Sequence, residues 1–252
     1  MDNLTSKIQA MTLRGKRKRS TSENVGRKRS NLSMLSDITF SNNNRLNVRL
    51  PRSTVNELRT IHKKSSKEQR EYGGRINLQR VMNKYAKFNA PNQLTGTRGR
   101  LPLTREVMNS YISYHTHPSS SNRDPKKKYF TLPSPDDVTI YNELYPQMQA
   151  NIIADEQGYY VIDILESGNV MSNASSLVTK NYQDFIRRMG YLNTQQRNMD
   201  GLVFYESTAG EWKANVIHKL NEYMTNTHRM SIRFYTYEEI PAIITLINKN
   251  RA

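Results

Sequence analysis

The chain has 252 residues, with 38 Lys or Arg against 22 Asp or Glu, a net charge of +16 and a mean hydropathy of -0.79. This length leaves room for one domain with tails and a modest core. The absence of cysteine excludes disulfides, a structural zinc with Cys ligands and a cysteine-protease mechanism. No apolar run approaches the roughly 20 residues of a membrane span and the first ten residues lack a signal-peptide core, so we expect a soluble intracellular protein without membrane contact.

Residues 1–52 form a strongly basic segment, with 12 Lys or Arg against 3 acidic residues, a net +9. Most of this charge lies in two clusters, which consist of Lys16, Arg17, Lys18 and Arg19 and of Arg27, Lys28 and Arg29. Few apolar residues interrupt them, so the segment cannot bury enough surface to offset its conformational entropy, which predicts a flexible arm. Residues 14–29 are typical of a nuclear localisation signal or of an arm that binds nucleic acid or a neighbouring subunit. A solvated tail without a dedicated partner is the alternative.

A domain is predicted from residue 53 to residue 252. It begins with the pattern of an amphipathic helix, a hydroxyl residue as cap followed by apolar residues at three-residue spacing: Ser53 or Thr54, then Val55, Leu58 and Ile61. Ile76 and Leu78 then alternate as in a strand, and the turn sequences between residues 81 and 103 predict loops around short strands.

The apolar residues of segment 107–114 predict a strand, which places His115 and His117 at its C-terminal end and stops at Pro118. Residues two apart on a strand point to the same face, so the two imidazoles lie side by side. Imidazole nitrogen suits zinc, and a catalytic zinc takes three protein ligands with a fourth position left to water. The histidine pair therefore predicts two ligands of a metal.

Seventeen residues past His117, Ser134-Pro135-Asp136-Asp137 is typical of a helix start. Ser134 is the predicted N-cap, Pro135 occupies the first helical position, and Asp137 reaches back to complete a capping box. A carboxylate that is fixed in the first turn of a helix is also a well-positioned ligand. Asp137 is therefore the candidate third ligand.

In this combination the chain resembles the JAMM metalloproteases, the zinc-binding members of the MPN domain group. The pattern of that family is an upstream Glu followed by small residues, His-x-His-Pro at the end of a strand, and Ser-x-x-Asp at the start of a helix. Here Glu71 precedes Tyr72-Gly73-Gly74, and the other two elements follow in the same order. The resemblance extends from about Thr54 to about Glu166. It implies an α/β (α+β) fold with an MPN-like mixed sheet flanked by helices.

The resemblance also implies a role for each position. His115, His117 and Asp137 would hold zinc, which lowers the pKa of a bound water toward about 7. Glu71 would take the proton of that water and return it to the departing amine. Ser134 would donate to the oxyanion of the tetrahedral intermediate. The activity so implied is cleavage of a peptide or isopeptide bond in a protein substrate, above all removal of ubiquitin or a related modifier.

The segment 119–133 departs from the family, because it is about twice as long as the expected gap between the second histidine and the serine. It contains the basic run Lys126-Lys127-Lys128. Next to a metal, such an insertion would cover the cleft, bind the substrate or disturb the cleft. Loop extensions cost little free energy, so its length does not argue against the fold.

The rest of the chain contains fewer candidate residues. Further elements are predicted from periodicity: strands over 151–154 and 159–165, helices over 177–189 and 211–223, a strand over 230–237, and a helix or strand over 240–247. Asp163 is an alternative metal ligand in principle, but no second histidine cluster accompanies it. His218 and His228 lack spaced partners and are predicted to be surface or packing residues.

Three hypotheses from different classes follow. The first is an active zinc isopeptidase or peptidase, deubiquitinase-like in substrate. The second is an MPN-fold structural or assembly component, for example of a viral particle or large complex, whose basic arm binds nucleic acid or a neighbour. The third is a nucleic-acid-associated protein similar to the RadC group, which shares the His-x-His-Pro element. The ligand set favours the first, and the basic clusters predict a nuclear or cytoplasmic location.

Overall fold

A computed structural model of the chain describes residues 38–41, 45–81, 85–88, 93–96, 101, 104–108, 110–119, 124–164, 175–189, 194–197 and 203–247. Met1–Ser36 and Asp37–Ala252 are separate units, and the description below concerns the second. The two basic clusters of the predicted arm, at residues 16–19 and 27–29, lie outside the described residues. Their predicted roles in localisation and nucleic-acid binding therefore stay predictions.

The elements of the first half are, in chain order, β1 (Ile38–Ser41), β2 (Arg45–Arg49), α2 (Arg52–Glu68), β3 (Tyr72–Arg75), β4 (Leu78–Val81), β5 (Tyr85–Phe88), β6 (Leu94–Thr95), α3 (Arg105–Met108) and β7 (Ile112–Thr116). Those of the second half are β8 (Tyr129–Thr131), α4 (Pro135–Leu144), β9 (Ala150–Ala154), β10 (Gly158–Ile164), α5 (Ser175–Arg188), β11 (Thr194–Arg197), β12 (Val203–Glu206), α6 (Ala209–Glu211), the π-helix η2 (Trp212–Ile217), α7 (His218–His228), β13 (Met230–Thr236) and β14 (Ile243–Ile247).

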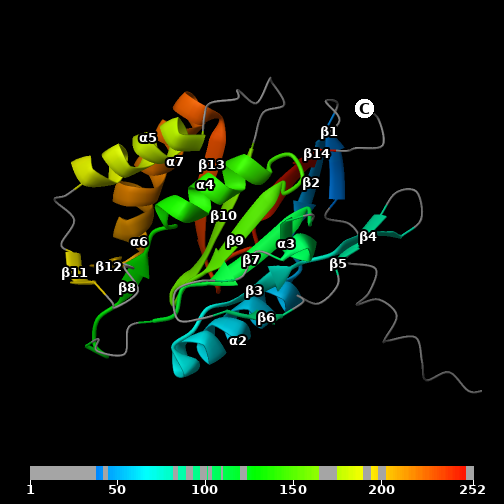
Figure 1. Cartoon of the computed structure of the whole chain (residues 1–252). Coiled ribbons are helices and arrows are strands. Elements are labelled where there is room, and N and C mark those ends of the chain that lie inside the picture. Colours follow the sequence, from blue (N-terminus) through cyan, green and yellow to red (C-terminus); the bar gives the residue numbers. More distant parts are fainter. Residues whose placement is uncertain are drawn as a thin grey trace, which may run out of the picture. The chain divides into compact units, whose positions relative to one another are not determined.

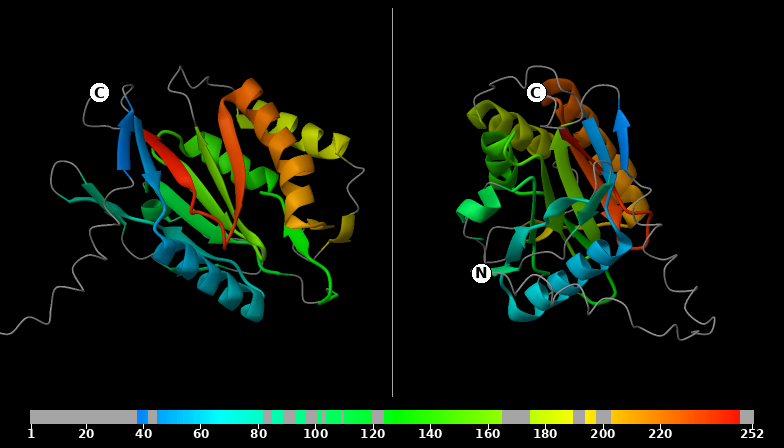
Figure 2. Two further views of the ribbon diagram at one scale, coloured as in Figure 1. Left: turned by 180° about the vertical axis from the view of Figure 1, so that it is seen from behind. Right: turned by 90° about the vertical axis from the view of Figure 1, so that its right-hand side faces the viewer.

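A six-stranded mixed sheet with the strand order β13-β10-β9-β7-β3-β6 forms the centre of the unit (Figure 1). β7 and β9 run parallel to each other, and all other neighbouring strands are antiparallel. Helices α4, α5 and α7 cover one face of this sheet, while α2 and the smaller sheet β1-β2-β14 lie on the opposite side (Figure 2). The predicted combination of a mixed sheet with flanking helices is confirmed.

Two hydrophobic cores fill the spaces on either side of the main sheet. Tyr160 and Ile162 of β10 belong to the core under the helices, whereas Tyr159 and Val161 belong to the core on the α2 side. Side chains alternate between the faces of a strand, so β10 contributes to both cores and is buried at every position. This agrees with the inner strand that its apolar pattern predicts.

The predicted arm of residues 1–52 is too long at its C-terminal end. β2 pairs with β14 in antiparallel register, and Val48 and Leu50 are buried in the core on the α2 side. β2 also pairs with the preceding strand β1, but β14, its partner on the other side, lies almost two hundred residues later in the chain, so local composition gives little sign that β2 belongs to the folded unit. The folded unit therefore includes residues that the charge count assigned to the arm.

The predicted strand over 107–114 is also wrong in its first half. Thr104 begins the helical turn α3, because its carbonyl and hydroxyl oxygens both accept hydrogen bonds from the backbone N–H of Val107, at 3.0 and 3.4 Å. β7 starts only at Ile112 and ends at Thr116, so His115 lies within the strand and His117 immediately after it. The local capping interaction outweighs the apolar pattern that favours a strand.

The last third of the chain confirms most predicted elements. α5 and β13 match the predictions closely, and a helical segment runs from Ala209 to His228 with a π-helical stretch in its middle. Within residues 240–247, for which the sequence leaves helix and strand open, residues 243–247 form strand β14 and pair with β2. These elements complete the cover of both faces of the main sheet.

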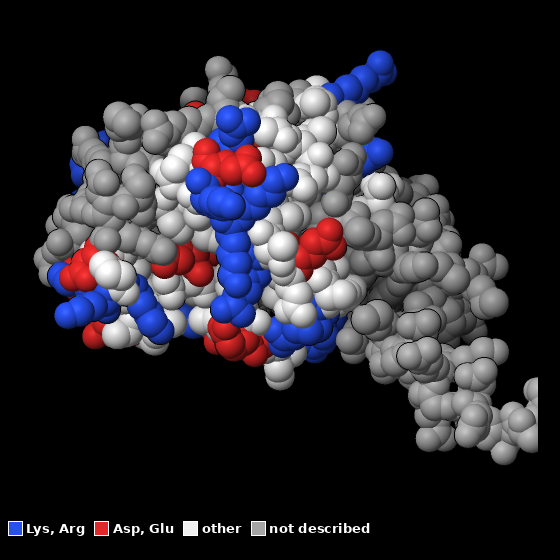
Figure 3. Space-filling model, turned by 90° about the horizontal axis from the view of Figure 1, so that it is seen from below, with Lys and Arg blue, Asp and Glu red and all other residues white. Residues whose placement is uncertain are grey.

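Helix α2 is confirmed, although its N-cap is Pro51 and not Ser53 or Thr54. It buries Val55, Leu58 and Ile61, and its outer face exposes several basic residues, Arg59, Lys63, Lys64 and Lys67. Figure 3 shows the side of the unit on which α2 lies, where Lys and Arg side chains form a band with acidic groups near its ends. Among the described helices, none has the length and apolar character that crossing a lipid bilayer requires.

Candidate metal centre

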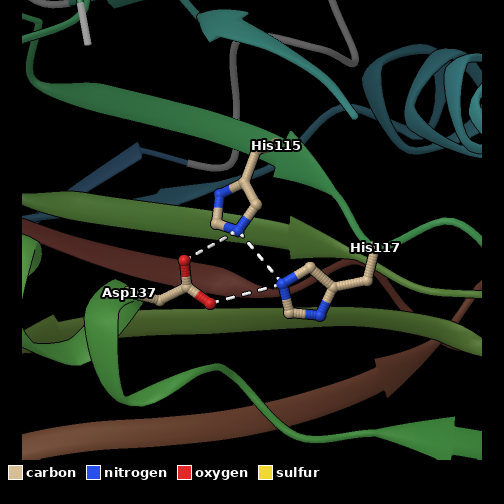
Figure 4. A group of neighbouring side chains, drawn as sticks. All are labelled: His115, His117 and Asp137. Atoms are coloured by element: carbon tan, nitrogen blue, oxygen red, sulfur yellow. Dashed lines mark hydrogen bonds and ion pairs between the residues drawn. The ribbon is translucent and has the colours of Figure 1, made fainter. Parts of the chain in front are cut away.

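His115, His117 and Asp137 converge on one point between the main sheet and helix α4 (Figure 4). The Nε2 atoms of the two imidazoles are 3.3 Å apart. Oδ1 of Asp137 lies 3.0 Å from Nε2 of His115, and Oδ2 lies 3.3 Å from Nε2 of His117. The described part of the chain thus contains a group of side chains that could hold a metal ion.

The strand explains why the two histidines point the same way. Ile112 and Tyr114 of β7 face the core on the α2 side, so the side chain of His115 faces the helices, and His117 follows two residues later. Both imidazoles are buried, with 8% of His115 and 2% of His117 exposed. The alternation along β7 therefore delivers both rings to the face on which α4 lies.

The start of α4 explains the position of Asp137, and the predicted capping box is confirmed. The backbone N–H of Ser134 donates to Oδ2 of Asp137 at 2.7 Å, and the backbone N–H of Asp137 donates to Oγ of Ser134 at 3.1 Å. The cap thus uses Oδ2 as its acceptor and leaves Oδ1 pointing at His115. The same carboxylate closes the helix and meets the two histidines, so both predicted roles are compatible.

The pKa values of His115 and Asp137 are both shifted within this cluster. Burial alone would lower the pKa of His115, but the Asp137 carboxylate outweighs it, with smaller contributions from Glu71 and Asn151, so the pKa is raised. Burial would raise the pKa of Asp137, but His115 and His117 outweigh it, so that pKa is well below its ordinary value. Without a metal, His115 and Asp137 therefore stabilise each other's charged forms.

Glu71 lies beside this cluster on the neighbouring strand. Gly73 of β3 is directly opposite His115 in the antiparallel register, so Glu71 comes opposite His117 when that register is continued. Tyr72 belongs to the core on the α2 side, so the side chain of Glu71 is directed to the face of the two histidines. Glu71 is buried, and its charge contributes to the raised pKa of His115.

Gly73 allows this close approach of β3 to β7. A Cβ atom at position 73 would lie 2.6 Å from the backbone oxygen of Tyr114 and 3.0 Å from Cβ of His115. Real Cβ atoms do not come so close to backbone atoms, so the strands could not pair in this way with a larger residue. The glycine that the sequence places after Glu71 is required by the packing against His115.

Ser134 is half-buried at the N-cap of α4, next to Asp137. Its Oγ accepts the hydrogen bond of the capping box, and that bond leaves the hydroxyl proton available for donation to another group. The structure thus brings together all five residues that the sequence analysis singled out for chemistry: three possible ligands in contact, with Glu71 and Ser134 on their flanks.

Helix α2 fixes the segment that follows His117. Nε2 of the buried His62 lies 3.1 Å from the backbone oxygen of His117. Oγ of Ser66 accepts from the backbone N–H of Ser119 at 3.0 Å, and the amide of Gln69 donates to the backbone oxygen of Ser119 at 2.9 Å. Sequence patterns do not identify these residues, because their partners are about fifty residues away in the chain.

Thr131 and Asp155 form a second support that the sequence analysis missed. Oγ1 of Thr131 lies 3.2 Å from Nδ1 of His117 and donates to Oδ2 of Asp155 at 3.0 Å. Asp155 belongs to the turn between β9 and β10, where sequence alone assigns it an ordinary turn role. Thr131 belongs to β8, which lies in the second half of the predicted insertion 119–133.

The second half of that insertion is a structural part of the fold. β8 pairs with β12, and the buried ring of Phe130 stacks on Trp212 with centroids 5.2 Å apart. Lys127 forms an exposed ion pair with Glu206 at 2.8 Å. Residues 120–123 lie outside the described part of the chain. The described residues 124–133 therefore support the cluster through Thr131.

The remaining candidates lie away from the cluster. Asp163 is directed to the opposite face of the sheet, where Oδ2 accepts from Arg233 at 2.6 Å and from the backbone N–H of Thr245 at 3.1 Å. His218 is exposed on α7, and His228 lies within 3.2 Å of the side-chain amide of Asn181. For the two histidines, these positions agree with the predicted surface or packing roles.

The cluster fits a zinc ion in size and in donor type. Ligand atoms about 2.0–2.2 Å from zinc and separated by a tetrahedral angle lie about 3.3–3.5 Å apart. The contacts between the three side chains, at 3.0–3.3 Å, are close to this spacing. Two imidazole nitrogens and one carboxylate oxygen are also the donor set of many catalytic zinc sites.

Comparisons with protein-family models, with curated proteins and with solved structures found no match for this chain.

Proposed function

We propose that this protein is a zinc-dependent isopeptidase or peptidase whose substrates carry ubiquitin or a ubiquitin-like modifier. The observation that carries the proposal is the convergence of His115, His117 and Asp137 at contact distances. The modifier as substrate follows from the resemblance to the JAMM metalloproteases. In this proposal the three side chains hold zinc, Glu71 is the general base, and Ser134 is the oxyanion donor.

The burial and the donor set of the cluster support a metal role. The Nε2 atoms of the two buried imidazoles lie 3.3 Å apart, and the oxygens of Asp137 lie 3.0 and 3.3 Å from them. A cation between them would satisfy both nitrogens and one oxygen of Asp137 at once. When bound, zinc would act as a Lewis acid that polarises a carbonyl and lowers the pKa of a water molecule.

The chain's own residues then provide proton transfer and charge stabilisation. The carboxylate of Glu71 takes a proton from the attacking water and later delivers it to the nitrogen of the departing amine. The hydroxyl of Ser134 donates to the oxygen of the scissile carbonyl as negative charge develops there. The capping box holds this hydroxyl beside Asp137 before the substrate binds, so little reorganisation is required.

Metal analysis of the purified full chain tests the metal part of the proposal. We expect about one zinc per chain in the wild type and in His218→Ala, a matched control in an exposed histidine, and none in His117→Ala. Equal zinc contents in the His117→Ala and His218→Ala variants would show that His117 does not bind the zinc, and the proposed metal site would be wrong.

Cleavage of ubiquitin conjugates and of fusions to ubiquitin-like modifiers tests the reaction. Glu71→Gln should retain zinc but lose cleavage by a factor of about 10²–10⁴, the usual contribution of general acid–base catalysis. Cleavage at the wild-type rate by Glu71→Gln would exclude Glu71 as the base. A wild-type chain that binds zinc but cleaves none of these substrates would leave a metal site without the proposed activity.

A further inference from the structure

Thr131 stands between His117 and a buried carboxylate on another loop. Its Oγ1 lies 3.2 Å from Nδ1 of His117 and 3.0 Å from Oδ2 of Asp155, and its backbone N–H donates to the same Oδ2 at 2.8 Å. All three residues are buried, with at most 2% of each exposed. No bulk water competes for these contacts, so the direction of each hydrogen bond is set by the residues themselves.

The direction follows from the number of donors around Asp155. Its two oxygens accept from the backbone N–H and the hydroxyl of Thr131 and from the backbone N–H of Gln157, the last at 2.7 Å. A hydroxyl has a single proton, and here it is donated to Asp155. Toward His117, Oγ1 can therefore only accept, and Nδ1 of His117 must be the ring nitrogen that bears a proton.

The protonated Nδ1 has a consequence at the other side of the ring. A neutral imidazole with its proton on Nδ1 has its free lone pair on Nε2. Nε2 is the atom of His117 that points at His115 and Asp137. A histidine that binds a metal through one nitrogen commonly donates its other N–H to such a partner, which fixes the tautomer and the orientation of the ring.

We propose that Thr131 and Asp155 are positioning residues, which hold His117 in the Nδ1–H tautomer and aim its Nε2 lone pair at the metal position. As far as it concerns zinc, this inference rests on the proposed function. The proton on Nδ1 itself follows from the contact with Thr131, which is present without a metal. Thr131 thereby gives the insertion 119–133 a role that its charge and length do not predict.

The surroundings of both residues are suited to this role. β8 holds Thr131 in place through its pairing with β12 and the stacking of Phe130 on Trp212. The Asp155 turn is fixed by the hydroxyl of Tyr237, which donates to the backbone oxygen of Asp155 at 2.8 Å. The backbone N–H of His117 also donates to the oxygen of Ala154 at 2.9 Å, which ties the histidine segment to the same turn.

Thr131→Val is the variant that removes the acceptor while it preserves the shape of the side chain and the strand preference. Thr131→Ser should preserve the hydrogen bonds that lead from His117 through the hydroxyl of residue 131 to Asp155, called the relay below, because serine retains the hydroxyl. Thr245→Val is the matched control, since its hydroxyl also donates to a side chain, Asn47 at 3.0 Å, but in the sheet on the opposite side of the unit. Thermal unfolding of each full-length variant shows whether it is folded before its other properties are compared.

Two measurements are made on each variant. The ring nitrogens of His117 are observed by ¹H–¹⁵N NMR of histidine-labelled, chelator-treated protein, with the signals assigned by their loss in His117→Gln. We expect the Nδ1–H form in the wild type, in Thr131→Ser and in Thr245→Val, and loss of that form in Thr131→Val. Zinc affinity is measured by competition with a chelating dye, where Thr131→Val should bind about tenfold or more weakly and the other two within about twofold of the wild type.

The outcomes separate the relay from the metal site. A wild-type His117 with its proton on Nε2, or a folded Thr131→Val variant that keeps the wild-type tautomer, overturns the relay. Unchanged zinc affinity in Thr131→Val, with zinc lost in His117→Ala, also overturns it and leaves the metal site intact. If the wild type binds no zinc, the proposed function fails, and the NMR result alone decides whether Thr131 sets the tautomer.

Discussion

Removal of the Asp137 carboxylate should destabilise the metal-free protein far more than removal of the neighbouring acid. Both Asp136 and Asp137 lie in the first turn of α4, but Asp136 is exposed, whereas Asp137 accepts from Ser134 and meets both histidines. Asp136→Ala therefore controls for the interaction of an acidic side chain with the helix dipole. The difference between the two variants reports the contacts that only Asp137 makes.

The magnitude follows from these contacts. An acid near a helix N-terminus contributes about 0.3–1 kcal/mol through the dipole, a term that both variants lose. Asp137→Ala also removes the acceptor of the Ser134 N–H, for which helix caps indicate about 1 kcal/mol. In addition it removes a buried hydrogen bond to a charged His115, typically about 1.5–3 kcal/mol. We therefore expect Asp137→Ala to lower the free energy of unfolding by about 2.5–4 kcal/mol more than Asp136→Ala.

Urea unfolding followed by circular dichroism measures this difference, at pH 6 and with a chelator present so that no zinc contributes. The dependence of the unfolding free energy on urea should be the same in both variants, as expected when only stability changes. If Asp137→Ala is as stable as Asp136→Ala to within about 0.5 kcal/mol, Asp137 does not hold the histidines in the metal-free state, and the electrostatic description of the cluster is wrong.

Three further predictions concern the packing, the protons and the metal. Gly73→Ala should lower the free energy of unfolding by about 1–3 kcal/mol in a thermal unfolding assay and weaken zinc binding, because the new Cβ would meet the Tyr114 backbone. The control Gly210→Ala should be neutral or stabilising in the same assay, because a Cβ at position 210 meets nothing within 4 Å. The raised pKa of His115 gives a contribution to stability that is complete below about pH 6.5 and fades as pH rises through the folded-state pKa. The lowered pKa of Asp137 gives a contribution that is present above about pH 3.9 and fades as pH falls through the folded-state pKa of Asp137. Metal-free stability should thus fall from pH 6 to pH 8 while zinc affinity rises, and titrations that show both moving in the same direction would contradict the assignment. Free zinc at one hundred times its dissociation constant should stabilise the wild type by about 2.7 kcal/mol and His117→Ala not at all, as unfolding with and without chelator will show.

The sequence alone predicts the three side chains of the cluster because each depends on a local rule. The alternation of a strand places His115 and His117 on one face, and the chemistry of a helix start places Asp137 at its N-terminus, whatever the rest of the fold. That the two elements face each other is not local information. The resemblance to a known motif supplied that expectation, and the contacts between the three side chains agree with it.

The residues that support the cluster follow no such local rule. Thr131 is one polar residue of a three-residue strand, and Asp155 has the sequence context of an ordinary turn. Their contacts with His117 and with each other join positions that are 14 and 24 residues apart. Neither helical nor strand periodicity relates residues at such distances, so only the tertiary structure identifies them. The same reason explains why composition alone places β2 in the arm, since β14, one of its two partner strands, lies at the other end of the chain.

The arrangement of these supports bears on why the cluster is polar at all. A buried pair of histidines and a carboxylate could be replaced by apolar side chains without loss of stability, because buried ionic groups contribute little net free energy. Here three separate elements approach the cluster with matched hydrogen bonds: β8 through Thr131, α4 through its cap, and α2 through His62. Thr131 contacts the ring of His117, the cap holds the carboxylate of Asp137, and His62 contacts the backbone oxygen of His117. With these contacts made, Nε2 of His117 and Oδ1 of Asp137 point to the centre of the cluster. The clustered atoms of the two imidazoles and the carboxylate lie 3.0–3.3 Å from one another and face a single point, which is an arrangement that suits a metal ion.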